Sequence, residues 1–126
     1  SMTSKDVGQQ STSGIELQGI VSASQKNFIT HVYEIIDSHL EDENYNVNQL
    51  ASDCGFSYSG FYIKIKAMTG ITPHDFLMTY KMNIAMELLK SHKYTVSEVS
   101  YKVGASSLAN FSRSFKNQFG VPPSAV

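Results

Sequence analysis

The sequence of 126 residues has no tryptophan, a single cysteine and three prolines, and its basic and acidic residues almost cancel. Cys54 alone cannot form an internal disulfide, and the four histidines do not have the spacing to it that a zinc site needs. No apolar run approaches the roughly 20 residues that cross a bilayer, and no signal segment opens the chain. We therefore expect a soluble, cytoplasmic protein without membrane contact, metal or cofactor.

Catalytic patterns are equally scarce. The sequence suggests no Ser-His-Asp or Cys-His arrangement and contains no glycine-rich phosphate loop, so we expect no enzyme activity from this chain. It does have 41% hydrophobic residues, enough for one packed core, and a length that fits one domain. The Ser1-Met2 start is typical of a cloning remnant. We expect the chain to come from a longer protein, in which any kinase or receiver domain would lie outside these residues.

The net charge of −1 hides two segments of opposite sign. Residues 1–44 contain two basic and seven acidic side chains, a net of −5, whereas residues 45–126 contain eight basic and four acidic ones, a net of +4. A basic segment of this kind favours contact with a polyanion such as nucleic acid, although many domains that bind nothing charged are as basic. The charge distribution alone leaves both interpretations open.

Hydrophobic periodicity begins only after about residue 25. Residues 1–25 are rich in Ser, Thr, Gly and Gln without a helical or strand period, which predicts a cloning remnant followed by a flexible linker. The domain itself is expected to occupy residues 26–126. Its first helix is indicated by an apolar stripe made of Phe28, Val32, Ile35, Ile36 and Leu40.

The rest of the chain carries many helix start and stop signals. Capping boxes begin at Asn46 and Thr95, and Thr72 precedes a proline at the first position of a helix. Glycines follow the apolar-periodic segments where helices are expected to end, at Gly55, Gly70, Gly104 and Gly120. Because strand-like alternation is missing, the pattern predicts an all-α domain, with helices near 47–54, 58–69, 73–91, 96–103 and 107–119.

The second half of this pattern repeats the first. With an offset of 49, residues 46–57 fall on residues 95–106, so that Ser57 is matched with Ser106; after one inserted residue, residues 61–73 fall on residues 111–123. Each copy has a short capped helix, a glycine-centred turn and a longer helix, as in a helix-turn-helix motif. A helical hairpin repeated only for packing is the alternative. We assign the first motif to 46–70, a linker helix to 73–91 and the second motif to 95–120.

The second helix of each copy has two different faces. Its apolar residues recur at helical spacing and are expected to face the core; they are Phe61, Ile65 and Met68, then Phe111, Phe115 and Phe119. No acidic residue lies between Gly55 and Gly70 or between Gly104 and Gly120, so phosphates would meet no like charge there. The linker helix is about 28 Å long, close to the roughly 34 Å between successive major-groove faces of a duplex. Both helices could therefore reach one side of DNA.

From about residue 26 to its end, the chain resembles the C-terminal DNA-binding domain of the AraC/XylS family of bacterial transcription regulators. Four segments carry the resemblance, and the last is the most specific: VNQLASDCGFS at 47–57, KAMTGITP at 66–73, AMELL at 85–89 and FSRSFKNQFGVPPS at 111–124. The acidic helix before the domain is similar to output domains of hybrid two-component regulators. The resemblance implies a homeodomain-like, all-α fold in which two helix-turn-helix subdomains are joined by a long central helix.

The resemblance also implies partners and contact residues. In this family the second helix of each motif lies in the major groove of promoter or operator DNA, so double-stranded DNA is the expected partner and RNA polymerase a candidate second one. Arg113 matches a base-reading arginine, and such a side chain can hold guanine O6 and N7 at once. A solvated surface position is the alternative for it, and more so for the lysines. The predicted DNA-binding residues are Tyr58, Ser59, Tyr62, Ile63, Lys66, Ser107, Leu108, Asn110, Ser112, Arg113 and Lys116.

Two positions depart from the family pattern. Ile63 stands where the first motif usually carries an arginine; it can contact a thymine methyl but cannot donate to guanine, so A·T-rich or shape-based recognition is expected there. Ala105 stands where the second turn commonly has phenylalanine, whereas the first turn keeps Phe56. We expect the missing ring to leave the second motif less tightly packed.

These patterns together predict a sequence-specific DNA-binding domain of a bacterial transcription regulator, monomeric in isolation and part of a parent that can dimerise. The alternative is a helical interaction module that contacts RNA polymerase or a signalling partner and binds DNA little, which Ile63 and the single arginine would allow.

Overall fold

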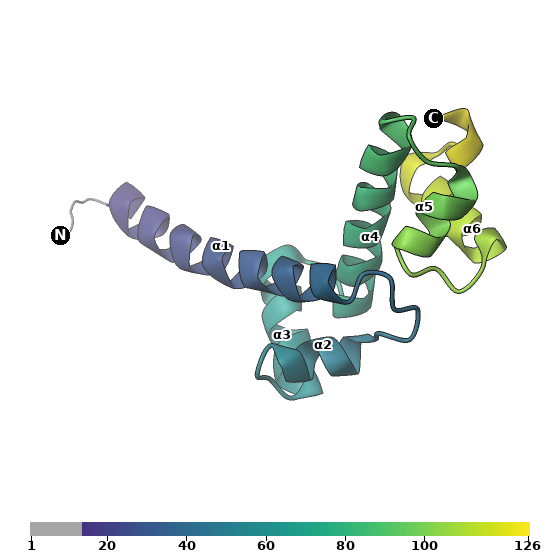
Figure 1. Ribbon diagram of the computed structural model, residues 1–126. Helices are drawn as coiled ribbons and strands as arrows, with labels where there is room; N and C mark the ends of the chain where they lie inside the picture. Colours follow the sequence, from purple (N-terminus) through teal and green to yellow (C-terminus); the bar gives the residue numbers. More distant parts are fainter. Residues whose placement is uncertain (1–13) are drawn as a thin grey trace. The chain divides into compact units, whose positions relative to one another are not determined.

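The computed structural model describes the backbone of residues 14–126 and the side chains of residues 26–126 (Figure 1). Over these residues it is helical throughout and has no strand, which confirms the predicted fold class. The described residues divide into two units, one that ends at Val32 and one formed by residues 33–126. In the described part, no helix is long and apolar enough to cross a membrane.

The first helix, α1 (Gly14–Ser38), begins well before the predicted helical stripe. Residues 14–25 were expected to belong to a flexible linker, and their helical backbone differs from that expectation. The physical reason is that no proline interrupts this segment, and a helix that is already nucleated extends with little cost per residue. The predicted cloning remnant and the rest of the predicted linker, residues 1–13, lie outside the described residues.

The five predicted helices of the domain are present, and each of their ends lies within one residue of the predicted one. They are α2 (Val47–Asp53), α3 (Tyr58–Thr69), α4 (Pro73–Lys90), α5 (Val96–Lys102) and α6 (Leu108–Phe119), followed by a short 3-10 helix, η1 (Pro123–Ala125).

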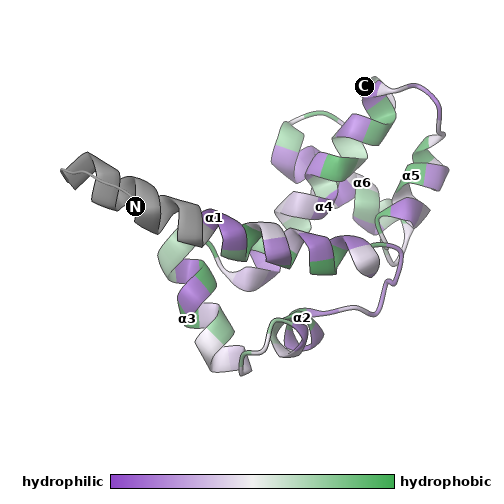
Figure 2. Cartoon of the chain, turned by 60° about the vertical axis from the view of Figure 1, so that its left-hand side comes forward, coloured by the Kyte–Doolittle hydropathy of each residue, from purple (hydrophilic) through white to green (hydrophobic). Residues whose placement is uncertain are grey.

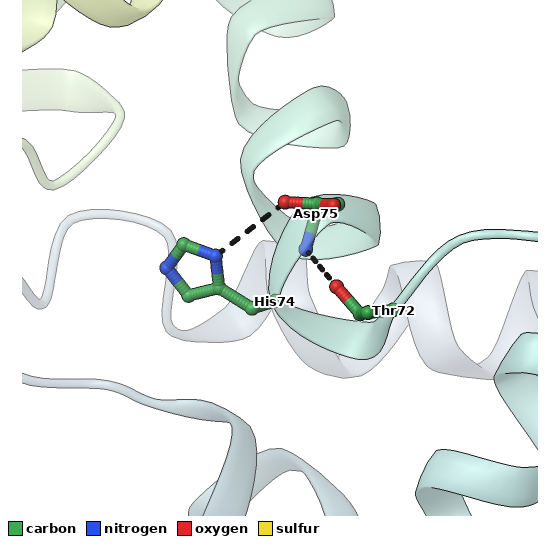
Figure 3. Close-up of polar contacts among 3 residues, drawn as sticks. All are labelled: Thr72, His74 and Asp75. Atoms are coloured by element: carbon green, nitrogen blue, oxygen red, sulfur yellow. Dashed lines mark hydrogen bonds and ion pairs between the residues drawn. The ribbon is translucent and has the colours of Figure 1, made fainter.

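Local side-chain hydrogen bonds explain where these helices begin. The capping boxes at Asn46 and Thr95 are both formed. In each, the side chain of the cap residue accepts a hydrogen bond from the backbone amide of the third helical residue, and the side chain of that third residue accepts one from the backbone amide of the cap. At the start of α4 the Thr72 hydroxyl accepts from the Asp75 amide at 3.2 Å, and Pro73 follows the cap (Figure 3). His74 Nδ1 lies 3.7 Å from Asp75 Oδ1 in the same turn.

The second turn is one residue longer than the first, and this difference corrects the predicted alignment of Ser57 with Ser106. The amide of Phe56 bonds to Ala51 and that of Ala105 to Ser100, so the offset of 49 holds that far. The caps of α3 and α6, however, are Ser57 and Ser107, which are 50 residues apart. Ser106 is therefore the inserted residue of the second turn, and Ser107 is the counterpart of Ser57.

Helix α4 supplies buried side chains to both motifs. Near its start, Phe76 and Leu77 are buried, and this part of the unit also buries Phe61 and Ile65 of α3. Farther along, Met82, Ala85 and Leu89 form one cluster with Val99, Val103, Phe111 and Phe115. Figure 2 shows hydrophobic and hydrophilic residues alternating along α4, α5 and α6, as expected for helices with one buried face. Met68 and Phe119, predicted to face the core, are half-buried.

The last turns of α1 and the segment between α1 and α2 are held by aromatic and hydroxyl contacts. The Tyr33 ring stacks on Tyr80 at 4.3 Å between centroids, and the Tyr80 hydroxyl donates to Asp37 at 2.7 Å. The Tyr45 hydroxyl donates to Asp53, also at 2.7 Å, and burial together with this carboxylate raises the pKa of Tyr45 above its usual range. The phenol thus stays protonated and remains a donor.

The same segment reaches the second turn at Gly104. A Cβ atom at this position would collide with the carbonyl oxygen of Leu40 and lie 3.3 Å from that of Asp42. A Cβ atom at Gly55, the equivalent glycine of the first turn, would have no neighbouring atom within 4 Å. Both residues have positive φ angles, +70° and +83°, so only the contact with the preceding segment distinguishes them.

We predict that Gly104→Ala destabilises the domain more than Gly55→Ala. Both variants place alanine in the left-handed region, at about 1–2 kcal/mol. Gly104→Ala also overfills a packed contact with backbone atoms, which adds about 1–3 kcal/mol. Urea denaturation of the two variants gives the free energies of unfolding, and equal values would contradict the contact.

Candidate nucleic-acid interface

The predicted contact residues of α3 are on its exposed face. Tyr58 and Tyr62 have ring centroids 6.3 Å apart, and Ile63 is 69% exposed. Ser59 and Lys66 are exposed as well. This surface offers two aromatic hydroxyls, one lysine and an apolar side chain, and the structure brings all five predicted residues of the first motif onto one helix with no acidic neighbour on it.

The predicted contact residues of α6 form a more ordered polar group. Arg113 donates from Nη1 to Asn110 Oδ1 at 2.8 Å, and Asn110 Nδ2 donates to the Ser106 hydroxyl, also at 2.8 Å. These two bonds hold the guanidinium relative to the turn, so that less side-chain freedom is lost when it binds a ligand. Arg113 is exposed and retains further N–H donors for such a ligand.

The remaining α6 residues have distinct positions. Leu108 is 47% exposed and Lys116 is exposed in the last turn, whereas Ser112 is only half exposed. The Ser107 hydroxyl accepts from the Asn110 amide at 3.1 Å and therefore acts as the helix cap. Both ends of the Asn110 side-chain amide are bonded within the domain, one to Ser106 and the other to Arg113.

Ser106 is a residue of this surface that sequence reasoning missed. Its hydroxyl is the acceptor that fixes Asn110, and it is the extra residue of the second turn. The first motif has Gly60 where the second has Asn110, and Ile63 where the second has Arg113, so it cannot form the same group. The one-residue difference in turn length is the sequence signal that could have indicated it.

A second missed feature is a polar contact between α6 and the middle of α4. Gln118 Nε2 donates to Asn83 Oδ1 at 2.8 Å and lies 3.5 Å from the Thr79 carbonyl oxygen. The bond fixes the last turn of α6 against the linker helix. The orientation of α6 is thus set by the buried phenylalanines on one side and by this amide pair at its C-terminal end.

A protein-family model described as a helix-turn-helix domain matches residues 60–126, which is more than half of the chain. The chain belongs to the AraC/XylS family of helix-turn-helix domains. This confirms the family resemblance that the sequence motifs indicated. For the described residues of this AraC-type domain, no group of three or more His, Cys, Asp or Glu side chains could hold a metal ion.

Curated relatives of this AraC-type domain include two bacterial proteins with different names. "Histidine kinase P4" of Formosa agariphila is 29% identical over 104 residues, which cover 82% of this chain and 8% of that protein. "Probable transcriptional regulator LumQ" of Photobacterium leiognathi is 31% identical over 88 residues, which cover 70% of this chain and 35% of that protein. The chain therefore spans about a third or less of the length of these relatives.

A solved structure with the same fold contains DNA. It is described as the DNA-binding domain of AdpA, a global transcriptional factor, in complex with a target DNA. This AraC-type domain matches it with a TM-score of 0.69 and 28% sequence identity, over 76% of this chain and 86% of that one.

The cap at Ser107 gives a prediction about the stability of α6. Ser107→Ala removes the acceptor for the Asn110 amide and is expected to lower the free energy of unfolding by about 1 kcal/mol. Ser59→Ala is the matched control, because Ser59 is exposed inside a helix, where alanine has a slightly better helix propensity. Thermal or urea denaturation compares the two, and a Ser107→Ala variant as stable as Ser59→Ala would contradict the cap.

Proposed function

We propose that the chain is the sequence-specific DNA-binding domain of a bacterial transcription regulator, with α3 and α6 entering successive major grooves of promoter or operator DNA. The observation that carries the proposal is the group formed by Ser106, Asn110 and Arg113, which presents a guanidinium on the exposed face of a helix-turn-helix second helix. A guanidinium in that position fits the O6 and N7 acceptors of guanine.

The spacing of the two helices supports binding to one side of a duplex. Helix α4 joins the motifs and, with 18 residues, is about 27 Å long. That length is close to the roughly 34 Å repeat of the major groove. The relatives that are named as transcriptional regulators, and the related domain in complex with a target DNA, are consistent with the same function.

The two motifs would contribute differently. Arg113 would specify a guanine, while Lys116 and Lys66 would contact phosphates and add affinity without sequence preference. The first motif, with Tyr58, Tyr62 and Ile63 exposed, offers apolar and hydroxyl contacts in place of a guanidinium. It would therefore favour thymine methyl groups or the shape of A·T-rich DNA.

We further propose that the parent protein is a hybrid two-component regulator whose output domain is this chain. The support is the relative named as a histidine kinase: the region that matches this chain makes up only 8% of that protein's length. In such a parent, kinase and receiver domains would lie outside the present residues, RNA polymerase would be a second partner, and dimerisation would come from the upstream parts. This domain alone would be a cytoplasmic monomer without catalytic activity.

The proposed function predicts how Arg113→Ala changes DNA binding. Duplexes selected from a random pool with the wild-type chain, and a scrambled duplex of equal composition, are compared by fluorescence anisotropy. Arg113→Ala should reduce the preference for the selected duplex by about 1–3 kcal/mol, because a bidentate contact to one guanine is lost. Lys116→Ala should weaken binding to both duplexes alike.

The control and the salt dependence make this test decisive. Lys93→Ala removes an exposed lysine outside both motif helices and should change neither affinity nor preference. Wild-type affinity should fall steeply with rising salt, because bound phosphates release counterions. Binding that is undetectable at low salt would instead favour a protein-interaction module. A preference that Arg113→Ala leaves intact would contradict the role proposed for Arg113.

A further inference from the structure

A pocket of about 370 Å³ lies between the segment that precedes α2, helix α4 and the second helix-turn-helix motif. Its lining combines apolar side chains of α4 and α6, among them Leu77, Met82 and Phe111, with the side chain of Lys81. Volumes of this size are typical of small-molecule sites, which are mostly apolar with a few polar groups. All of its lining residues belong to the unit formed by residues 33–126.

The pocket exists where the second motif lacks an aromatic ring. In the first motif, the Phe56 ring lies beside Phe61, with centroids 6.2 Å apart. The counterparts of these residues are Ala105 and Phe111, and both of them line the pocket. Replacing phenylalanine by alanine in the second turn removes the side chain that packs there in the first. The expectation of looser packing at Ala105 thus corresponds to a defined space.

Lys81 is a buried cation at this space. Only 6% of the residue is exposed, and no described residue forms an ion pair or a hydrogen bond with its ammonium group. Burial lowers the pKa of Lys81, and the charge of Asp42 partly offsets this effect. A buried charge without a bonded partner is costly, and an anion in the pocket would relieve that cost.

The other charged groups around the pocket help to determine which ligand charge it favours. Arg113 and His74 line it on the positive side, and Glu43 on the negative side. His74 is adjacent to Asp75, at 3.7 Å, so a positive charge on this histidine would be partly neutralised. Asp42, whose charge acts on Lys81, and Glu43 together balance the fixed charges of Lys81 and Arg113. An anion would therefore be selected by a direct bond to the Lys81 ammonium group and not by an excess of positive charge.

We propose that this pocket binds a small organic anion whose negative group bonds to Lys81 and whose apolar part packs against Leu77, Met82 and Phe111. A carboxylate at the end of a short hydrocarbon has both properties. A bare inorganic anion would leave the apolar lining unused, and an uncharged hydrocarbon would leave Lys81 without a partner.

The proposal is tested by titrating the 126-residue chain with hexanoate at pH 7 and following its amide resonances by NMR. The amides of Gly104, Ala105 and Phe111 should shift saturably, and 1-hexanol should bind about ten-fold or more weakly, because it lacks the charged acceptor. Sodium sulfate should not reproduce the effect. Since no DNA is present, the outcome is independent of the proposed DNA-binding function.

Three variants locate the site. Lys81→Met keeps an unbranched stem and should abolish the difference between hexanoate and hexanol, whereas Lys90→Met, at an exposed position of the same helix, should bind as the wild type does. Ala105→Phe should fill the space and block both compounds. Equal binding of hexanoate and hexanol by the wild type, sulfate binding as tight as hexanoate, or hexanoate binding unchanged in both Lys81→Met and Ala105→Phe would overturn the proposal.

Discussion

Helix α4 must bury apolar side chains in two places at once, and the arrangement of residues 33–126 depends on that requirement. Its first turns pack with α3, and its later turns complete the cluster that holds Phe111 and Phe115 of α6. A single continuous helix therefore fixes the distance between two exposed helix faces. Lys81 occurs where the first buried set gives way to the second, which explains how a lysine comes to be buried in a domain of this size.

The two motifs share the same order of helices and turn but differ in the side chains at equivalent positions. The first has the Phe56 ring in its turn, beside Phe61, and carries Gly60 and Ile63 on α3, so it presents no guanidinium. The second has a longer turn, a small Ala105 and the bonded pair of Asn110 and Arg113. The open space beside Ala105 lies in the second copy, where the Phe56 ring of the first has no counterpart.

Features that depend on near neighbours in sequence could be predicted, and features that depend on distant ones could not. The capping boxes at Asn46 and Thr95 and the glycine at the end of each second helix are local, so the helices were predicted to within a residue. Ser106 was misaligned because the inserted residue makes two adjacent serines, Ser106 and Ser107, equally good matches to Ser57 in the sequence. The burial of Lys81 comes from contacts with residues distant in the sequence, which leave no periodic pattern. The helical start of α1 comes from helix propagation without apolar spacing.

The contact at Gly104 has a consequence for the order in which the domain assembles. The carbonyl groups of Leu40 and Asp42 meet a residue roughly sixty positions later in the chain, so the contact closes a long loop and cannot form until the second turn has been synthesised. Both motifs rest on local caps and on α4, and these can form earlier because their contacts close shorter loops. We therefore expect the contact between this segment and Gly104 to form later than the local caps.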